Sequence, residues 1–223
     1  MAESQMSAVL DILGPLYGEG VYPGRSDGMG APTWREEPFQ ILIATLLSQR
    51  TRDENTRRAA DSLFSSYPDL QSMAGVEAEE LEPLIRPAGF PRQKAKAIAG
   101  ICQALLERFD GKVPADMDSL LSLPMVGRKT ANCVLAYAFD EDAICVDTHV
   151  HRISNLLGEV ETKTPDETEM ALRERVPRER WKEINRYLVR HGQKICIPRR
   201  ERCGDCPVQS LCRHGSSLVV AKE

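Results

Sequence analysis

Residues Leu123–Arg152 read LPMVGRKTANCVLAYAFDEDAICVDTHVHR and hold the most informative pattern in the chain. A tight turn containing Pro124 and Gly127 precedes an apolar helix, and Asp147 opens a second helix. The first backbone amides of a helix have no acceptor within the helix, so they point toward any anion placed there, such as a DNA phosphate. The turn therefore indicates a phosphate-binding corner, although an ordinary helical corner would show the same pattern.

Lys129 and Asp147 carry the chemistry that this stretch offers. Lys129 falls in the first helical turn, where the helix dipole disfavours a positive charge, and burial there would also lower its pKa. A neutral amine is what a Schiff-base nucleophile requires. The two residues are eighteen positions apart, so only tertiary structure can bring them together, and we expect them to meet across a cleft. The simpler interpretations are an exposed lysine and a carboxylate that caps its helix.

Four of the seven cysteines lie close together near the C-terminus, with the spacing C-x6-C-x2-C-x5-C: Cys196, Cys203, Cys206 and Cys212. In an intracellular chain such clustering favours a metal site over disulfides. Thiolates suit zinc or an iron–sulfur centre, and the spacing alone does not choose between them. Cys102, Cys133 and Cys145 each stand alone among apolar residues, so we expect them in the core.

The composition is that of a globular protein, with 42% hydrophobic and 28% charged residues among 223. No apolar run is long enough to cross a bilayer, and the N-terminus lacks the basic start of a secretory signal. We therefore expect a cytoplasmic protein, nucleoid-associated in a prokaryote, with no membrane partner. The net charge is −4, yet residues 178–213 hold ten basic and four acidic residues and so carry +6. This region offers an electrostatic footprint for DNA, or simply a solvated basic surface.

Apolar residues recur at helical spacing along most of the chain, and no strand-length alternation is present, so we predict an all-α fold. Residues 18–33 are predicted to form a surface connection, Asp53 to cap the helix after it, and the tail after Cys212 to be loose. The expected helices cover residues 5–17, 38–47, 54–64, 77–85, 91–109, 116–122, 128–139, 148–157, 166–175 and 178–191.

Three signatures, in this order, resemble endonuclease III of the helix–hairpin–helix DNA glycosylase superfamily: LPMVGRKTAN, VDTHVHR and the cysteine spacing. LSQRTRDENT and GFPRQKAKAI resemble its upstream helices, so the similarity covers residues 5–213. The resemblance implies a six-helix barrel with the helix–hairpin–helix at 31–141. It also implies an iron–sulfur domain made of 1–30 and 142–223, with DNA in the cleft between the two domains. The four clustered cysteines would then hold a [4Fe–4S] cluster.

The same resemblance implies a bifunctional DNA glycosylase and AP lyase of base excision repair. It would remove oxidised pyrimidines from duplex DNA and cleave 3′ to the abasic site by β-elimination. Lys129 matches the catalytic lysine that forms the Schiff base, and Asp147 matches the catalytic aspartate. We expect a monomer that binds double-stranded DNA carrying damaged bases or abasic sites. The expected DNA contacts are Gln49, Arg50, Gly127, Arg128, Thr130, His149, Arg199, Arg200 and Arg202.

Two points stay open at the level of sequence. Either Gln49 or Arg50 would fill the gap left by a flipped base. The family's hairpin usually reads LPGVG, whereas this chain has Met125 in place of the first glycine, which is costly if the backbone there has a positive φ.

The competing hypotheses are a mismatch glycosylase that excises adenine or thymine, a non-catalytic iron–sulfur protein that binds DNA or senses redox state, and a zinc-binding DNA adaptor. The lysine weighs against the mismatch glycosylase.

Overall fold

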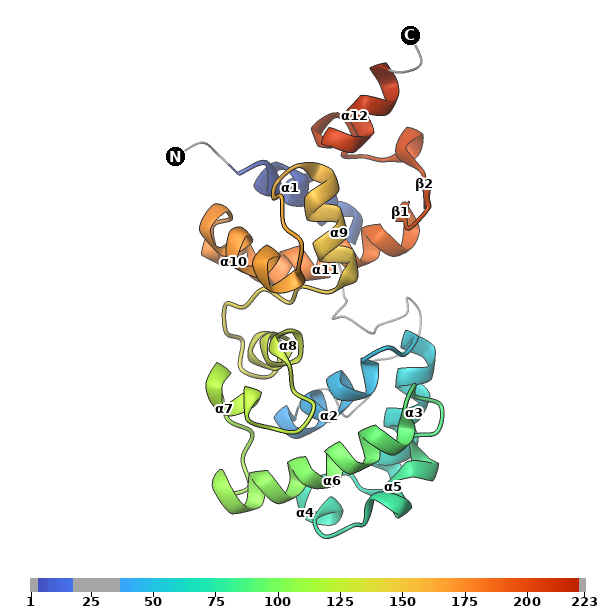
Figure 1. The fold of residues 1–223 in the computed structure, drawn as a ribbon, viewed down its shortest axis with the longest axis vertical. Helices are drawn as coiled ribbons and strands as arrows, with labels where there is room; N and C mark the ends of the chain where they lie inside the picture. Colours follow the sequence, from blue (N-terminus) through green and yellow to red (C-terminus); the bar gives the residue numbers. More distant parts are fainter. Residues whose placement is uncertain (1–3, 18–36, 221–223) are drawn as a thin grey trace. The chain divides into compact units, whose positions relative to one another are not determined.

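The computed structural model describes residues 4–17 and 37–220, which fold almost entirely into helices (Figure 1). The predicted all-α class is confirmed. The chain divides into two compact units, one made of Met1–Pro23 with Asp142–Glu223 and one made of Gly24–Glu141. The predicted connection at 18–33 and the predicted domain limit near residue 30 lie outside the described residues. Within the described residues, no helix is both long and apolar enough to span a membrane.

The continuous unit is organised around α2 (Pro38–Ser48), which is apolar on nearly every side and packs against α3, α6 and α8. Its Phe39, Leu42 and Leu46 are buried, and a fully buried side chain of this kind contributes about 1.5–3 kcal/mol. Pro38 suits the first helical position because its missing N–H would have no partner there. The other helices are α3 (Asp53–Ser66), α4 (Leu70–Met73), α5 (Ala78–Leu84), α6 (Pro91–Arg108), α7 (Met117–Leu121) and α8 (Arg128–Ala138).

The second unit combines α1 (Gln5–Tyr17) from the start of the chain with helices from its last third. Apolar residues of α1, α9 and α11 form its core, including Leu10, Ile153 and Leu188. Buried Glu159 accepts a hydrogen bond from the Met6 amide, so it satisfies an orphan donor at the start of α1. Its remaining helices and strands are α9 (Thr148–Leu157), α10 (Pro165–Arg175), η2 (Arg178–Arg180), α11 (Trp181–Lys194), β1 (Cys196–Ile197), β2 (Arg200–Glu201), η3 (Cys203–Asp205), η4 (Gln209–Leu211) and α12 (Arg213–Val220).

Two local predictions are wrong. As far as residue 220, the tail after Cys212 is not loose, because it forms α12, which packs against α9 and η4. Asp53 does not cap α3: Arg52 occupies the cap position and Asp53 is the first helical residue, where its charge suits the helix dipole. The cysteine loop contains an antiparallel pair of two-residue strands, β1 and β2, which are too short to leave a period-two pattern.

Candidate active site and cysteine loop

The hairpin between α7 and α8 is held by its two apolar residues. Leu123 and Val126 are buried, and the Val126 amide donates to the Leu123 carbonyl at 3.2 Å. Pro124 packs over Gly100 of α6, where a Cβ would lie 3.2 Å from the proline ring. Gly127 occupies the N-cap position of α8 with an extended backbone, so the amides of the first turn are directed away from the body of the helix. This is the geometry of an anion-binding helix start.

Met125 has a left-handed backbone, with φ of 57°. For an L-residue this conformation costs about 1–2 kcal/mol, which glycine would avoid. The side chain is 43% exposed, so it points out of the hairpin rather than into the core. The substitution at this position therefore strains the backbone and places an apolar group on the surface beside the anion-binding corner.

The turn between α2 and α3 contacts the hairpin through Gln49. Its Nε2 donates to the Met125 carbonyl at 3.0 Å and to Oγ1 of Thr130 at 3.1 Å. Thr130 is buried and its hydroxyl accepts this bond, so its side chain ties the hairpin to the turn. Arg50 is different, because it is exposed, has φ of 52°, and lays its guanidinium 5.4 Å from the ring centroid of Phe90.

The two candidate catalytic residues lie in different units. Lys129 is partly exposed in the first turn of α8, immediately after Arg128. Asp147 is the N-cap of α9, as predicted, and its Oδ1 accepts a 2.8 Å hydrogen bond from the Val150 amide. Within the described part of the chain, Oδ2 of Asp147 has no such donor. The cap therefore fixes the carboxylate and leaves one oxygen available.

His149 packs against α11. A Cβ on Gly192 would lie 2.3 Å from its Nδ1, so a glycine is needed for the imidazole to fit there. This nitrogen is sheltered from solvent and has no partner among the described residues. The contact gives His149 a structural role at the start of α9, and a phosphate contact by its ring stays a prediction.

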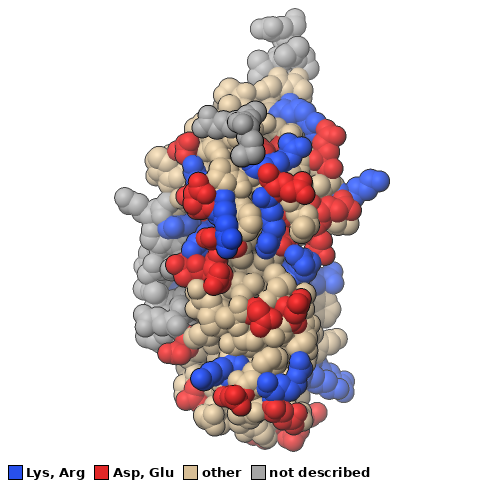
Figure 2. Space-filling view, turned by 90° about the vertical axis from the view of Figure 1, so that its left-hand side faces the viewer, with Lys and Arg blue, Asp and Glu red and all other residues tan. Residues whose placement is uncertain are grey.

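Much of the basic region 178–213 is neutralised by ion pairs. Arg178 pairs with Asp142 at 2.9 Å, Arg180 with Asp11 at 2.8 Å, and Arg202 with Asp205 at 2.7 Å. Figure 2 shows basic and acidic side chains mixed on the face drawn there.

Arg199 and Arg200 differ from these paired arginines. They are exposed at the tip of the β1–β2 hairpin, where their side chains form no ion pair with any described residue. These two arginines therefore remain available to an anion.

The four clustered cysteines converge on one small hollow in the second unit, which Ile153, Leu156 and Leu157 also line. None of them is in a disulfide. Burial raises the pKa of the thiols of Cys196, Cys203 and Cys206, and the neighbouring sulfurs raise it further. A cation among them would oppose both effects, so the donor set fits a metal centre.

Polar groups from three helices reach the sulfurs. Arg152 of α9 donates to Sγ of Cys196 at 3.3 Å and to its carbonyl at 2.5 Å. The Gly215 amide donates to Sγ of Cys212 at 3.3 Å, and Nε2 of His191 lies 3.5 Å from Sγ of Cys206. Burial, with the Arg152 charge adding to it, lowers the pKa of His191 to about 4, so this imidazole is neutral near pH 7.

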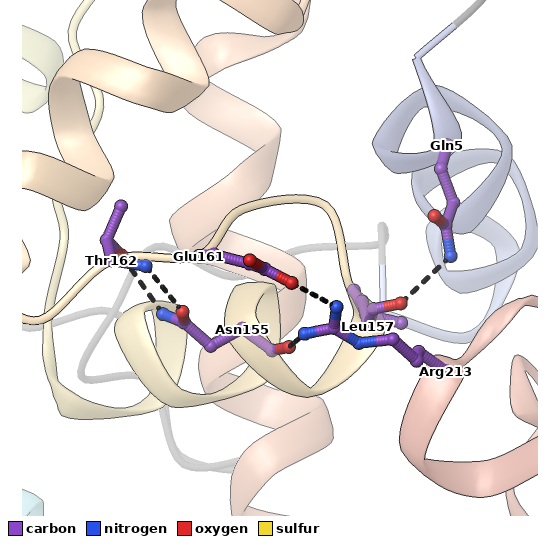
Figure 3. A network of polar contacts seen from close by, with 6 residues as sticks. All are labelled: Gln5, Asn155, Leu157, Glu161, Thr162 and Arg213. Atoms are coloured by element: carbon purple, nitrogen blue, oxygen red, sulfur yellow. Dashed lines mark hydrogen bonds and ion pairs between the residues drawn. The ribbon is translucent and has the colours of Figure 1, made fainter. Parts of the chain in front are cut away.

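The C-terminal end of α9 is held by residues from other elements, and Figure 3 shows Gln5 and Arg213 reaching its carbonyls. The Asn155 carbonyl accepts a hydrogen bond from Nη2 of Arg213, and the Leu157 carbonyl accepts one from the Gln5 side-chain amide. The Leu156 carbonyl accepts one from Sγ of Cys212. Arg213 also pairs with Glu161. These contacts satisfy carbonyls that would otherwise lack partners at a helix end.

Sequence reasoning missed Lys94, which is only 1% exposed. Its Nζ donates to the carbonyls of Leu47 and Gln49 and to Oγ1 of Thr51. A signal was available, because Lys94 shares a helical face with Ile98, Ile101 and Leu105, all buried. A lysine in such a position requires internal acceptors for its ammonium group.

The comparisons with known proteins agree with one another. The family described as HhH-GPD superfamily base excision DNA repair protein matches residues 43–178. Endonuclease III of Thermotoga maritima is 48% identical over 176 residues, which are 79% of this chain and 83% of that protein. Endonuclease III of Bacillus subtilis is 40% identical over 80% of this chain and 82% of its own length.

Solved structures match nearly the whole chain. A trapped covalent intermediate of endonuclease III with DNA has a TM-score of 0.85 at 33% identity, covering 98% of this chain and 99% of its own. A thermostable thymine-DNA glycosylase, with a TM-score of 0.80 at 23% identity, shares the fold alone. The chain therefore belongs to the HhH-GPD superfamily of base excision DNA repair proteins, among the endonuclease III relatives.

Proposed function

We propose that this protein is a bifunctional DNA glycosylase and AP lyase of base excision repair, acting on double-stranded DNA through Lys129. The observation that carries the proposal is the position of Lys129 in the first turn of α8, directly after the hairpin, in a chain 48% identical to an endonuclease III. Oxidised pyrimidines are the substrate class that the resemblance favours.

Lys129 acts as the nucleophile. A damaged base must leave the duplex before its sugar can be attacked, because C1′ is inaccessible inside the stack. The Lys129 amine forms a bond to C1′ as the bond between sugar and base breaks, and the base departs with the electron pair. Attack on C1′ first gives an aminal; loss of an N–H proton and breaking of the C1′–O4′ bond, with O4′ taking up a proton, then open the sugar ring and give the protonated imine. The imine makes the 2′ proton acidic, and β-elimination removes this proton and breaks the C3′–O bond, with the 3′ phosphate as the leaving group. A relative trapped as a covalent complex with DNA is consistent with this chemistry.

Asp147 serves the departure of the base. Positive charge develops on the sugar at that stage, and a fixed carboxylate can stabilise it and assist proton transfer. Oδ1 of Asp147 is committed to the Val150 amide, which orients the group, while Oδ2 is open among the described residues. The capping role and the catalytic role therefore use different oxygens of one carboxylate.

Arg50, rather than Gln49, is the better candidate for the gap left by a flipped base. The amide of Gln49 is occupied by the Met125 carbonyl and by Thr130. Arg50 is exposed beside Phe90, and a planar guanidinium can stack on bases and donate hydrogen bonds to them. Phosphates would bind at the first turn of α8 and at Arg199 and Arg200.

The four clustered cysteines would hold the [4Fe–4S] cluster. Among the described residues, no group of three or more His, Cys, Asp or Glu side chains is arranged to hold a single metal ion. Four thiols around a shared hollow suit a larger centre better. When bound, the cluster would cross-link the loop that carries Arg199 and Arg200 and would take no part in the reaction at the sugar.

Two substitutions test the proposal. Lys129→Gln should abolish borohydride trapping on a duplex with an abasic site, because an amide cannot form the imine. Asp147→Asn should slow base removal by about 10²-fold or more, as expected for the loss of a group that acts on the departing base. Lys112→Gln, at an exposed lysine of the same unit, is the matched control.

A panel of duplexes with single defined lesions tests the substrate class. Preferential excision of oxidised pyrimidines is expected. Trapping by Lys129→Gln at the wild-type level would show that the nucleophile is another residue, and excision restricted to mismatched adenine or thymine would replace the substrate class.

A further inference from the structure

Lys94 lies on the apolar face of α6, and its ammonium group bonds, among the described residues, to oxygen atoms at the end of α2 and in the turn after it. Nζ donates to the Leu47 carbonyl at 2.7 Å, to the Gln49 carbonyl at 2.7 Å and to Oγ1 of Thr51 at 2.9 Å. The two carbonyls belong to the end of α2, where the helix dipole favours a cation. All three donors of the ammonium group are therefore used to hold one turn.

Burying this charge is costly. In the described part of the chain Lys94 forms no ion pair, and burial lowers its pKa to about 8. A methionine would fill similar space without burying a charge, so packing alone does not account for a lysine here. The three hydrogen bonds to the turn are the contacts that only the lysine provides.

The hydroxyl of Thr51 extends the same network to a second loop. It accepts from Lys94 and also from the Gly89 amide at 2.9 Å. The backbones approach so closely here that a Cβ on Gly89 would lie 2.7 Å from the Arg50 carbonyl. The turn at 48–52 and the loop that ends at Phe90 are therefore joined as one rigid piece.

The two joined loops contain two residues with a strained backbone conformation. Arg50 and Phe90 both have left-handed conformations, with φ of 52° and 57°, and neither is a glycine. Each such residue costs on the order of 1 kcal/mol, and strain of this kind persists only where surrounding contacts enforce it. The bonds around Lys94 and Thr51 are the contacts that enforce it here, and they present the two exposed side chains next to each other.

We propose that Lys94 is a positioning residue for base extrusion: its hydrogen bonds to Leu47, Gln49 and Thr51 hold Arg50 and Phe90 in the conformation that opens the duplex. This inference rests on the proposed function, in which Arg50 enters the gap left by the flipped base. Lys94 does not contact the reacting atoms. Its loss therefore slows steps that need an opened duplex and leaves imine formation on an already exposed sugar unchanged.

The experiment compares two substrates. Single-turnover excision of one thymine glycol from a duplex requires base extrusion, whereas borohydride trapping on a single-stranded oligonucleotide with one abasic site does not. Lys94→Met keeps the volume of the side chain and removes the three bonds. Duplex excision should fall by about 10²-fold, the usual result of a small misplacement of a working group, while trapping on the single strand stays at the wild-type level.

A second variant and a direct signal support the comparison. Thr51→Val removes the bonds to Lys94 and Gly89 with little change of shape, and it should lower duplex excision in the same direction by a smaller factor. In both variants, 2-aminopurine placed beside the lesion should brighten less on binding than with the wild type. Lys96→Met, on the exposed side of α6, is the matched control and should behave as wild type.

The outcomes separate the two proposals. If the wild type neither excises the lesion nor forms a trapped complex, the proposed function is wrong. If the wild type does both and the folded variants excise normally, the role of Lys94 is wrong. Equal loss of duplex excision and single-strand trapping would also overturn it, because that pattern reports general damage to the unit. Should Lys94→Met fail to fold by circular dichroism, Thr51→Val decides the question.

Discussion

Two irregular segments of the molecule, the turn at Ser48–Arg52 and the loop at Cys196–Cys212, carry arginines that we expect to contact DNA. The two segments are stabilised in different ways. The turn is fixed by groups of the polypeptide itself, with the Lys94 ammonium group at the centre. The cysteine loop has a two-residue hairpin and single 3-10 turns, and its side chains converge on a hollow lined by four thiols. The first is preorganised by hydrogen bonds, whereas the second would be completed by the proposed cluster.

The largest effect is expected from a substitution that disrupts the cysteine loop and leaves the turn at 48–52 unchanged. Cys203→Ser should remove the visible absorbance of the cluster and open the loop to proteases between residues 196 and 212, since a structural metal contributes on the order of 10 kcal/mol to such a segment. Fragments mapped by mass spectrometry should leave residues 37–141 intact. Cys102→Ala, at a buried cysteine outside the loop, should keep the absorbance. A loop that resists proteases without the chromophore would show that the polypeptide holds it unaided.

One substitution made in both regions gives the next largest effect. Gly89→Ala forces a Cβ to within 2.7 Å of the Arg50 carbonyl, so the backbone must shift at a cost of about 1–3 kcal/mol. Gly204→Ala in the cysteine loop meets nothing within 4 Å and should change stability little. Thermal unfolding of both variants measures the difference. Equal midpoints would mean that the two loops at 48–52 and 89–90 are not tightly joined.

The smallest expected effect is a gain in stability rather than a loss. Met125→Gly should stabilise the protein by about 1 kcal/mol, because glycine adopts the left-handed backbone without steric cost and loses only part of that gain to chain entropy. Gly127→Ala, two positions on, has open space and no positive φ, so its stability should hardly change. Denaturation midpoints measure both. A less stable Met125→Gly would show that the exposed methionine makes contacts worth more than the strain.

The sequence was sufficient for the class of fold, most helices and the Asp147 cap, because these depend on local periodicity and on capping residues. The sequence was not sufficient where contacts between distant residues determine the local structure. The tail after Cys212 forms α12, and Arg213 at its start finds a partner on α9, the Asn155 carbonyl, that is 58 residues away in sequence. The strained backbones of Arg50 and Phe90 follow from the network around Lys94, which spans 43 residues between Lys94 and Thr51.

The way the two units are built determines the order in which they can fold during synthesis. Residues 37–141 form one unit from continuous sequence, whereas the core partners of α1 among the described residues all come after residue 142. At about 5–20 residues per second, a ribosome needs roughly 6–25 s to pass from the end of α1 to the start of its partners. During that time the apolar face of α1 remains without its packing partners; this face comprises Met6, Val9, Leu10 and Leu13. The nascent chain is therefore most exposed to aggregation at its beginning, and it is protected only when the last helices emerge.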